Sequence, residues 1–114
     1  MHSLIDIGLN LTEKSFAKDS NEVVDRAIQS GVGQMILTGS SVSGSEKSLT
    51  IAKQYPNILF STAGIHPHEA SEFTQDSILS LKQLAQHPEV VAIGECGLDF
   101  NRMYSSQQIQ EECF

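Results

Sequence analysis

The chain has 114 residues, of which 39% are hydrophobic, and its formal net charge is −7 at pH 7. This length suits one small domain or part of a larger one, and the hydrophobic content excludes an intrinsically disordered composition. The acidic charge and the lack of a basic run argue against an electrostatic DNA-binding module, which usually presents a basic stripe. Bound phosphate would therefore need a metal ion, a helix N-terminus or a few local cations.

The sequence also indicates where the protein resides. No stretch approaches the roughly 20 apolar residues of a membrane span, and the first residues lack the basic and apolar regions of a signal peptide. Two cysteines, Cys96 and Cys113, are too few for a disulfide framework. We therefore expect a cytoplasmic protein with reduced thiols and no membrane partner.

The first predicted unit is a strand followed by a helix. The apolar segment Leu4–Leu9 predicts a buried strand. Apolar residues at helical spacing predict a helix over Asn21–Ser30, and Gly31 suits the position just after a helix. A second buried strand is predicted over Gln34–Thr38.

The second helix and third strand follow in the same order. The segment Ser43–Glu46 has the S-x-x-E pattern of a capping box, which predicts a helix start. This helix is expected to reach about Tyr55, because Pro56 cannot continue it. The third strand is predicted over Ile58–Gly64.

Two further elements complete the pattern. Thr74 or Asp76 is expected to cap a helix that reaches about Gln86. The fourth strand is predicted over Val90–Gly94 and is expected to be buried, and Ser105–Gln108 resembles a second capping box that begins a fourth helix.

Strands that alternate with helices at this pitch predict a parallel sheet with right-handed crossovers. The predicted fold class is α/β, with residues 1–114 forming the first four βα units, the N-terminal half, of a (β/α)₈ TIM barrel without a second domain. A complete four-stranded doubly wound sheet is the alternative. A half barrel leaves its first and fourth strands unpaired, so those edges need a cover, and self-association is one way to supply it.

Glu95 is the strongest candidate for chemistry, because it follows an apolar strand at the end where α/β folds place their sites. Gly94 and Gly97 flank it, so the backbone can approach a ligand closely. Such carboxylates bind divalent metals, although a surface carboxylate is an equal alternative. Asp99 is expected to brace the following loop or contact substrate, and Arg102 to clamp phosphate or lie solvated on the surface.

Histidines and an asparagine follow the other strands. His66 and His68 form an H-P-H arrangement after the third strand, where His66 lies nearer the strand end. Two imidazoles at this spacing can share a metal, although two surface histidines are the plainer interpretation. Asp6 and Asn10 share a face if the first strand is regular, and Asn10 offers donors and an acceptor at the strand end.

Three segments, LIDIGLNLT, AGIHPH and VAIGECGLDFNR, occur in order along the chain. Together they strongly resemble the TatD family of metal-dependent deoxyribonucleases, which belongs to the amidohydrolase-like barrels. The resemblance implies a (β/α)₈ barrel and a cytosolic 3′–5′ exonuclease on DNA, in some members on RNA, with links to DNA repair. It implies a divalent cofactor, Mg²⁺ first, with Mn²⁺ or Zn²⁺ as alternatives, and single-stranded DNA 3′ ends as partners.

The resemblance also implies roles for single residues. Glu95 matches the family's metal-ligating catalytic glutamate, and His66 matches a histidine that contacts substrate phosphate. Asp99 and Arg102 lie in the same signature and shape the substrate-binding mouth. Asn10 replaces one of two metal histidines of the D-x-H-x-H pattern, and it is expected to bind substrate, with contact to metal or water as the alternative.

The sequence departs from the family pattern in two places. Gly8 and Asn10 stand where many relatives have the two strand-one histidines, which weakens the case for a two-metal site. The later family ligands have no positions in this chain, so we expect an inactive or nearly inactive fragment of a nuclease. The alternatives are a non-catalytic fragment that self-associates and an amidohydrolase-like enzyme that hydrolyses a small molecule.

Overall fold

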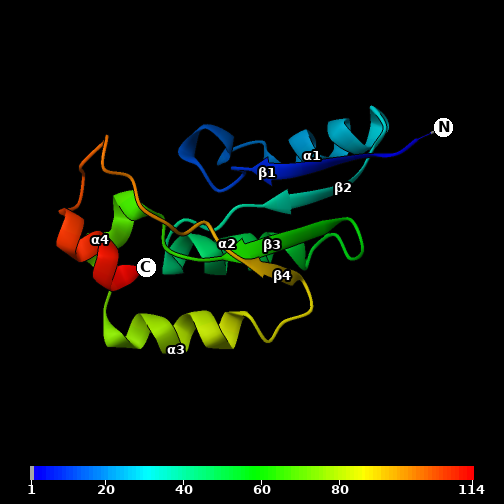
Figure 1. Cartoon of the computed structure of the whole chain (residues 1–114). Coiled ribbons are helices and arrows are strands. Elements are labelled where there is room, and N and C mark those ends of the chain that lie inside the picture. The colour runs from blue at the N-terminus through cyan, green and yellow to red at the C-terminus, as the bar shows by residue number, and fades with distance from the viewer. Residues whose placement is uncertain (1) are drawn as a thin grey trace.

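The computed structural model describes residues 2–114, in which parallel strands alternate with α-helices (Figure 1). The strands and α-helices in chain order are β1 (Leu4–Leu9), α1 (Ser20–Gln29), β2 (Val32–Leu37), α2 (Val42–Ala52), β3 (Leu59–Ala63), α3 (Gln75–Leu84), β4 (Val90–Ile93) and α4 (Gln107–Cys113). Two short 3₁₀ helices, η1 (Lys14–Phe16) and η2 (Pro67–Glu72), lie in the connections. The elements match the predicted ones, with most boundaries shifted by a few residues.

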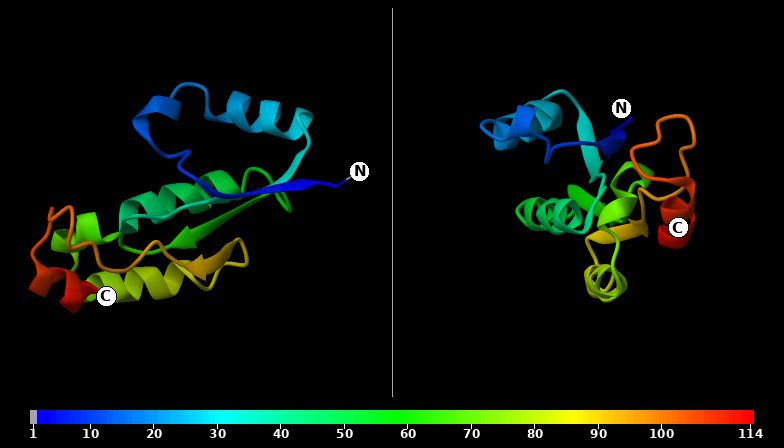
Figure 2. Two further views of the ribbon diagram at one scale, coloured as in Figure 1. Left: turned by 45° about the horizontal axis from the view of Figure 1, so that its top comes forward. Right: turned by 90° about the vertical axis from the view of Figure 1, so that its left-hand side faces the viewer.

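The strands form one sheet in the order β1-β2-β3-β4, and each neighbouring pair is parallel. Parallel order places the carboxyl ends of all the strands at one edge, from which the loops to the following helices depart. In the right-hand view of Figure 2, α1, α2 and α3 follow one side of the row of strands, and α4 lies on the other side. The α/β fold with a parallel sheet is therefore confirmed.

The second helix begins earlier than predicted. Ser41 is its N-cap, and the Ser41 hydroxyl accepts a hydrogen bond from the backbone N–H of Gly44 at 3.0 Å. The predicted capping box at Ser43–Glu46 is therefore wrong, because Ser43 is already inside the helix. Ser41 is in the extended conformation, which lets its side chain reach back over the first turn.

For α3 and α4, the structure shows which of two neighbouring candidate residues is the N-cap. Thr74, and not Asp76, is the N-cap of α3, and the Ser77 hydroxyl accepts from the Thr74 backbone N–H at 3.0 Å. Ser106 caps α4 by accepting from Ile109 at 3.3 Å, so the predicted box that began at Ser105 is wrong by one residue. The buried Ser105 hydroxyl instead accepts from the Ser71 backbone N–H, which ties η2 to the start of α4.

The main core lies between the two central strands and the helices on the outer side. Its fully buried members are Met35, Leu37 and Leu59 from the sheet, with Leu11, Val24 and Ala52 around them. Burying aliphatic side chains of this size stabilises a fold by about 1.5–3 kcal/mol each. The core thus holds β2 and β3 rigidly and fixes the positions of their carboxyl ends.

The first and fourth strands are exposed, which corrects the prediction that both are buried. Ile7 in β1 is 77% exposed and Ile93 in β4 is 61% exposed. A continuous apolar run is the signature of a parallel strand covered on both faces, yet within residues 2–114 each of these strands pairs on one side and lies at an edge. Asp6 in β1 is also exposed, so its carboxylate remains hydrated.

None of the helices in the described part of the chain has the length and apolar character needed to span a membrane.

Candidate active site

A hollow of about 440 Å³ lies at the carboxyl edge of the sheet. It is lined by residues from or beside all four strands: Ile7, Gly8, Asn10, Ile36, Thr38, Thr62, Gly94 and Glu95. Asn10 and Glu95 therefore face one space although 85 residues separate them (95−10). At Gly8, φ is +149° and the register of β1 shifts, so Ile7 and Gly8 both line the hollow despite being adjacent in sequence.

The backbone of Glu95 is fixed by its neighbours in the sheet. Its N–H donates to the Gly39 carbonyl at 2.6 Å, and the preceding Gly94 N–H donates to the Ala63 carbonyl at 2.9 Å. Gly64 permits this close approach, because a Cβ there would lie 2.6 Å from the Glu95 carbonyl oxygen. The Glu95 side chain remains 54% exposed, so a fixed backbone presents a carboxylate that a ligand can reach.

His66 is oriented by two backbone contacts. Its N–H donates to the Ser40 carbonyl at 2.9 Å, and its ring Nδ1 accepts from the backbone N–H of His68 at 3.0 Å. Since Nδ1 uses its lone pair to accept, the ring proton of neutral His66 resides on Nε2. That atom lies 3.4 Å from Glu95 Oε1, so His66 presents a donor beside the carboxylate. This arrangement suits contact with an anion better than metal ligation through Nε2.

A second group of side chains centres on Asp99. Its Oδ2 lies 2.8 Å from His68 Nε2 and 3.4 Å from Arg102 Nε, and its Oδ1 accepts from the backbone N–H groups of Asn101 and Arg102 at 3.0 Å each. The backbone N–H of Arg102, followed by the hydrogen bond with His68, holds the pKa of Asp99 well below its ordinary value of 3.8. Asp99 therefore braces its own loop, as predicted, and also holds His68.

The predicted residues thus form two neighbouring groups. Asn10 and Glu95 line the hollow and His66 lies beside Glu95, whereas Asp99 and Arg102 lie with His68, which the sequence ranked below His66. The rings of His66 and His68 link the groups, with centroids 4.3 Å apart in an edge-to-face arrangement.

Hydroxyl groups that no motif marks support the strand ends. The Thr62 hydroxyl accepts from the Gly39 N–H at 3.0 Å, and the Ser45 hydroxyl accepts from the Gly64 N–H at 3.2 Å. The Gly39 carbonyl in turn accepts from the Glu95 N–H, and Gly64 lies close to the Glu95 carbonyl. Sequence reasoning missed both hydroxyls, because a serine in a helix and a threonine in a strand carry no signal of a long-range role.

The donors at the hollow fit a divalent cation as part of a ligand set. Glu95 supplies an exposed carboxylate and Asn10 an amide oxygen, which are ligands that Mg²⁺ accepts together with water. Among residues 2–114, however, no group of three or more His, Cys, Asp or Glu side chains is arranged to hold a metal ion. These residues alone therefore do not form a complete protein cage for a metal.

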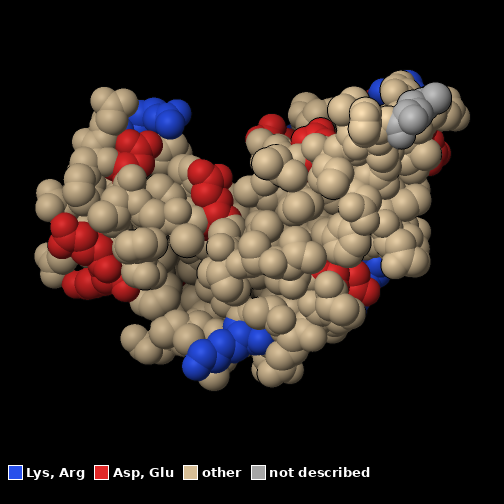
Figure 3. Space-filling model, turned by 45° about the vertical axis from the view of Figure 1, so that its right-hand side comes forward, with Lys and Arg blue, Asp and Glu red and all other residues tan. Residues whose placement is uncertain are grey.

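The surface charge does not mark a broad phosphate-binding face. On the face in Figure 3, acidic side chains lie beside a central hollow, whereas Lys and Arg are sparse. The whole chain has 7 Lys and Arg residues against 14 Asp and Glu residues. Arg102 is 66% exposed, so its guanidinium can reach a phosphate while it pairs with Asp99. Phosphate binding here would depend on a few placed groups.

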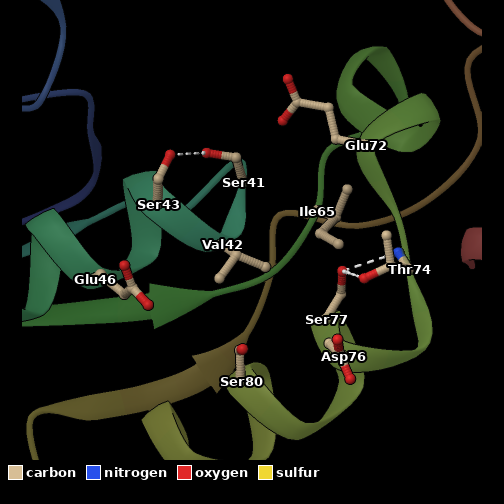
Figure 4. Close-up of a pocket in the computed structure, with 10 residues that line it drawn as sticks. All are labelled: Ser41, Val42, Ser43, Glu46, Ile65, Glu72, Thr74, Asp76, Ser77 and Ser80. Carbon is tan, nitrogen blue, oxygen red and sulfur yellow. Dashed lines mark hydrogen bonds between the residues drawn. The ribbon is translucent and has the colours of Figure 1, made fainter.

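A separate cavity of about 340 Å³ lies between the starts of α2 and α3 (Figure 4). Ser41, Ser43 and Glu46 line it from α2 and its cap, and Thr74 and Asp76 from the start of α3. The Ser41 and Ser43 hydroxyls lie 3.4 Å apart, and the Thr74 hydroxyl lies 3.3 Å from that of Ser77. This cavity contains none of the predicted site residues, so the candidate site remains the hollow at the strand ends.

Comparisons with known proteins bear on this site. The family described as "TatD related DNase" matches residues 5–114. The chain is 47% identical over 111 residues to the "3′-5′ ssDNA/RNA exonuclease TatD" of Erwinia tasmaniensis, and 51% identical over 111 residues to the protein of the same name from Musicola paradisiaca. The crystal structure of a hydrolase TatD family protein from Entamoeba histolytica resembles this one with a TM-score of 0.87 at 31% sequence identity.

These likenesses cover nearly all of this chain and less than half of each relative. The matches include 97% of this chain but 43% and 42% of the two curated relatives, and 98% of this chain but 43% of the Entamoeba histolytica chain. The predicted fold class is confirmed, because the four parallel strands and their helices match this portion of (β/α)₈ barrel proteins.

Proposed function

Because the chain belongs to the TatD-related DNase family, we propose that it is the N-terminal half of a TatD-type barrel in a metal-dependent 3′–5′ exonuclease. The proposed substrates are the 3′ ends of single-stranded DNA, and RNA as well, as the names of its curated relatives say of those proteins. The observation that carries the proposal is the reachable Glu95 carboxylate, held beside a histidine donor at the strand ends. A cytoplasmic location and a role in DNA repair belong to the same proposal.

Glu95 is the proposed catalytic metal ligand, and Mg²⁺ is the proposed ion, with Mn²⁺ or Zn²⁺ as alternatives. A divalent ion supplies a water of lowered pKa and neutralises charge on a phosphate. Glu95 suits this role because the hydrogen bond from its N–H to Gly39 fixes the backbone, while the carboxylate faces the hollow. Asn10, which lines the same hollow, is proposed to orient water or substrate with its amide.

The other proposed residues bind the substrate phosphate. His66 donates through Nε2–H, because its Nδ1 is already bonded to the His68 backbone. Arg102 contributes the nearby positive charge, and Asp99 holds both Arg102 and His68 in place. Few phosphate-binding cations suit an enzyme that acts on a strand end one nucleotide at a time, because such contact does not require a long basic groove.

Activity of the 114-residue chain alone is proposed to be absent or very low. Its described residues offer Glu95 as the one strong anionic ligand at the hollow, beside the neutral Asn10. Mg²⁺ requires octahedral coordination by oxygen, and one carboxylate with one amide oxygen fills only a minority of those positions. The incomplete set supports a site to which further residues contribute.

A nuclease assay on a chimera tests the proposal. The chimera joins this chain at Phe114 to the remainder of the Musicola paradisiaca relative, and its substrate is 3′-labelled single-stranded DNA with Mg²⁺. We expect the chimera to release mononucleotides, the 114-residue chain to release almost none, and a Glu95→Ala chimera to be inactive. A folded chimera that releases no nucleotide would overturn the nuclease proposal and leave hydrolysis of a small molecule as the alternative. Equal activity of the short chain would overturn the proposed incompleteness.

Self-association is the second candidate, and exposed edge strands favour it. Ile5 and Ile7 in β1 and Val91 and Ile93 in β4 are each about half exposed or more, and exposed strand edges tend to pair with other chains. Light scattering on the 114-residue chain tests this proposal. A dimer or larger species supports it, whereas a monomer at every concentration overturns it.

A further inference from the structure

A buried glutamine holds the loop that carries Asp99 and Arg102. Gln110 lies in α4 and is 1% exposed, although glutamine is mostly a surface residue. Its Oε1 accepts from the backbone N–H of Asp99 at 2.8 Å, and its Nε2 donates to the carbonyl oxygens of Asp99 at 3.0 Å and Ser105 at 2.9 Å. One side-chain amide thus satisfies three backbone groups of a single loop.

Gln110 contacts Asp99, which is the centre of the group of side chains that also includes His68 and Arg102. Its two bonds to Asp99 fix the backbone on both sides of that residue, and so fix the direction of the Asp99 carboxylate. One oxygen of that carboxylate faces His68 at 2.8 Å, and the other accepts from the backbone N–H of Arg102 at 3.0 Å. A change at Gln110 would therefore displace His68 and Arg102 through Asp99.

Only an amide of this length fits the three contacts. Methionine at position 110 has similar volume but leaves three backbone groups without partners, which is costly in a buried place. Glutamate keeps an acceptor for the Asp99 N–H but turns an oxygen towards two carbonyl oxygens. The exposed Gln108 on the same helix bonds instead to Glu112 at 3.0 Å, so it offers a matched control.

We infer that Gln110 is a positioning residue for substrate binding, which sets the places of His68, Asp99 and Arg102 without touching the reacting groups. This inference rests on the proposed nuclease function for its consequence in catalysis. The positioning itself is a property of the loop and can be measured without substrate.

Amide hydrogen exchange and imidazole ¹⁵N shifts on the 114-residue chain test the positioning. Gln110→Met should speed exchange of the Asp99 amide about tenfold or more, with unchanged protection at Leu37 and Leu59, and should move the His68 ring shifts towards those of Asp99→Ala. Gln108→Met should change neither. Unchanged Asp99 exchange and His68 shifts in a folded Gln110→Met chain would overturn the inference. If Gln110→Met fails to fold, Gln110→Glu provides the same two readouts, with the same outcomes deciding.

Kinetics in the nuclease chimera test the consequence. Gln110→Met should raise KM for single-stranded DNA about tenfold and leave kcat within about twofold, since loss of uniform binding raises KM alone. A general loss of folded protein would lower apparent kcat at constant KM, which would overturn a positioning role. A wild-type chimera without activity would refute the proposed function, while the exchange and ¹⁵N measurements would still decide the positioning.

Discussion

The two halves of the sheet differ in what they bring to the site. The end of β2 contributes backbone groups, since the Gly39 carbonyl accepts from Glu95 and the Ser40 carbonyl accepts from His66. The end of β1 contributes the neutral side chain of Asn10. The ends of β3 and β4 contribute the ionisable side chains, His66 and Glu95, and the loop after β4 adds Asp99.

This difference indicates that the two halves of the sheet have different roles. The backbone groups at the end of β2 hold the two reactive side chains from the neighbouring strands, and the buried core beneath β2 and β3 keeps those groups still. In the proposed nuclease, chemistry therefore depends mainly on side chains in the second half, and their alignment depends on the first. Substitutions in the two halves should therefore affect different quantities, namely stability in the first half and activity in the second.

Removal of Glu95 should have the largest effect. In the nuclease chimera, Glu95→Ala is expected to lower kcat/KM more than about 100-fold, because even partners of metal ligands contribute 10–100-fold. The side chain is 54% exposed, so the melting temperature should change little. Nucleotide release measures the first quantity and thermal unfolding the second. A large drop in melting temperature would show that Glu95 contributes to stability, and it would contradict the difference between the two halves of the sheet.

A core substitution in β2 should affect stability instead. Leu37 is fully buried, so Leu37→Ala should lower the free energy of unfolding by about 2–5 kcal/mol. Ile7 in the exposed β1 is the matched control, and Ile7→Ala should cost less than about 1 kcal/mol. Urea unfolding of the 114-residue chain measures both. Similar losses at the two positions would show that β1 is covered in solution, as self-association predicts.

Low pH should lower the folding stability of the protein through Asp99, which belongs to the second half. The folded state holds the pKa of Asp99 below its ordinary value of 3.8, so the unfolded chain binds this proton more tightly. The contribution of the carboxylate to stability is therefore complete above that value and declines as the pH falls below it. Asp99→Asn should unfold with a shallower pH dependence below about pH 4. Identical slopes for the two proteins would remove Asp99 from the network.

Asn10 provides a smaller test of the first half. Its amide is neutral and lines the same hollow as Glu95, so Asn10→Ala in the chimera should lower kcat/KM by about tenfold or less, as the loss of one neutral hydrogen bond predicts. Asn10→Asp keeps the size and adds a carboxylate, and should change the concentration of Mg²⁺ needed for half-maximal activity. An effect of Asn10→Ala as large as that of Glu95→Ala would contradict the division between the halves.

The smallest effect concerns two thiols that line one cavity near α4. Cys96 is exposed, whereas burial and the neighbouring Cys96 raise the pKa of the Cys113 thiol. Because the thiolate is the reactive form, iodoacetamide should alkylate Cys96 faster than Cys113 at pH 8. Peptide mass spectrometry over time measures the two rates. Faster labelling of Cys113 would mean that the end of α4 is displaced in solution.

The sequence predicted the order of elements and the strand ends well, because both follow from local periodicity and from the parallel sheet that it implies. The exposure of side chains in β1 and β4 was not predictable from their composition, since a strand at an edge and one at the centre of a parallel sheet have the same apolar run. The cap positions at Ser41 and Ser106 differ from the predicted ones because several serines in a row fit the same pattern.

The site was predicted in part for a similar reason. Glu95 and His66 follow apolar strands, which is a signal that one segment can carry. The bond of His68 to Asp99 and the contacts of Gln110 link segments 31 and 11 residues apart, and no local pattern encodes such pairs.

The hydrogen bond from the His68 backbone to His66 Nδ1 limits what this histidine can do with protons. A ring relays a proton when one nitrogen takes it up while the other releases it. The His66 ring has one nitrogen occupied by a peptide N–H that never leaves, so only Nε2 can exchange. His66 therefore exchanges a proton at the rim through Nε2 alone and does not pass one through its ring, so in the proposed hydrolysis the proton of the attacking water would leave along another route.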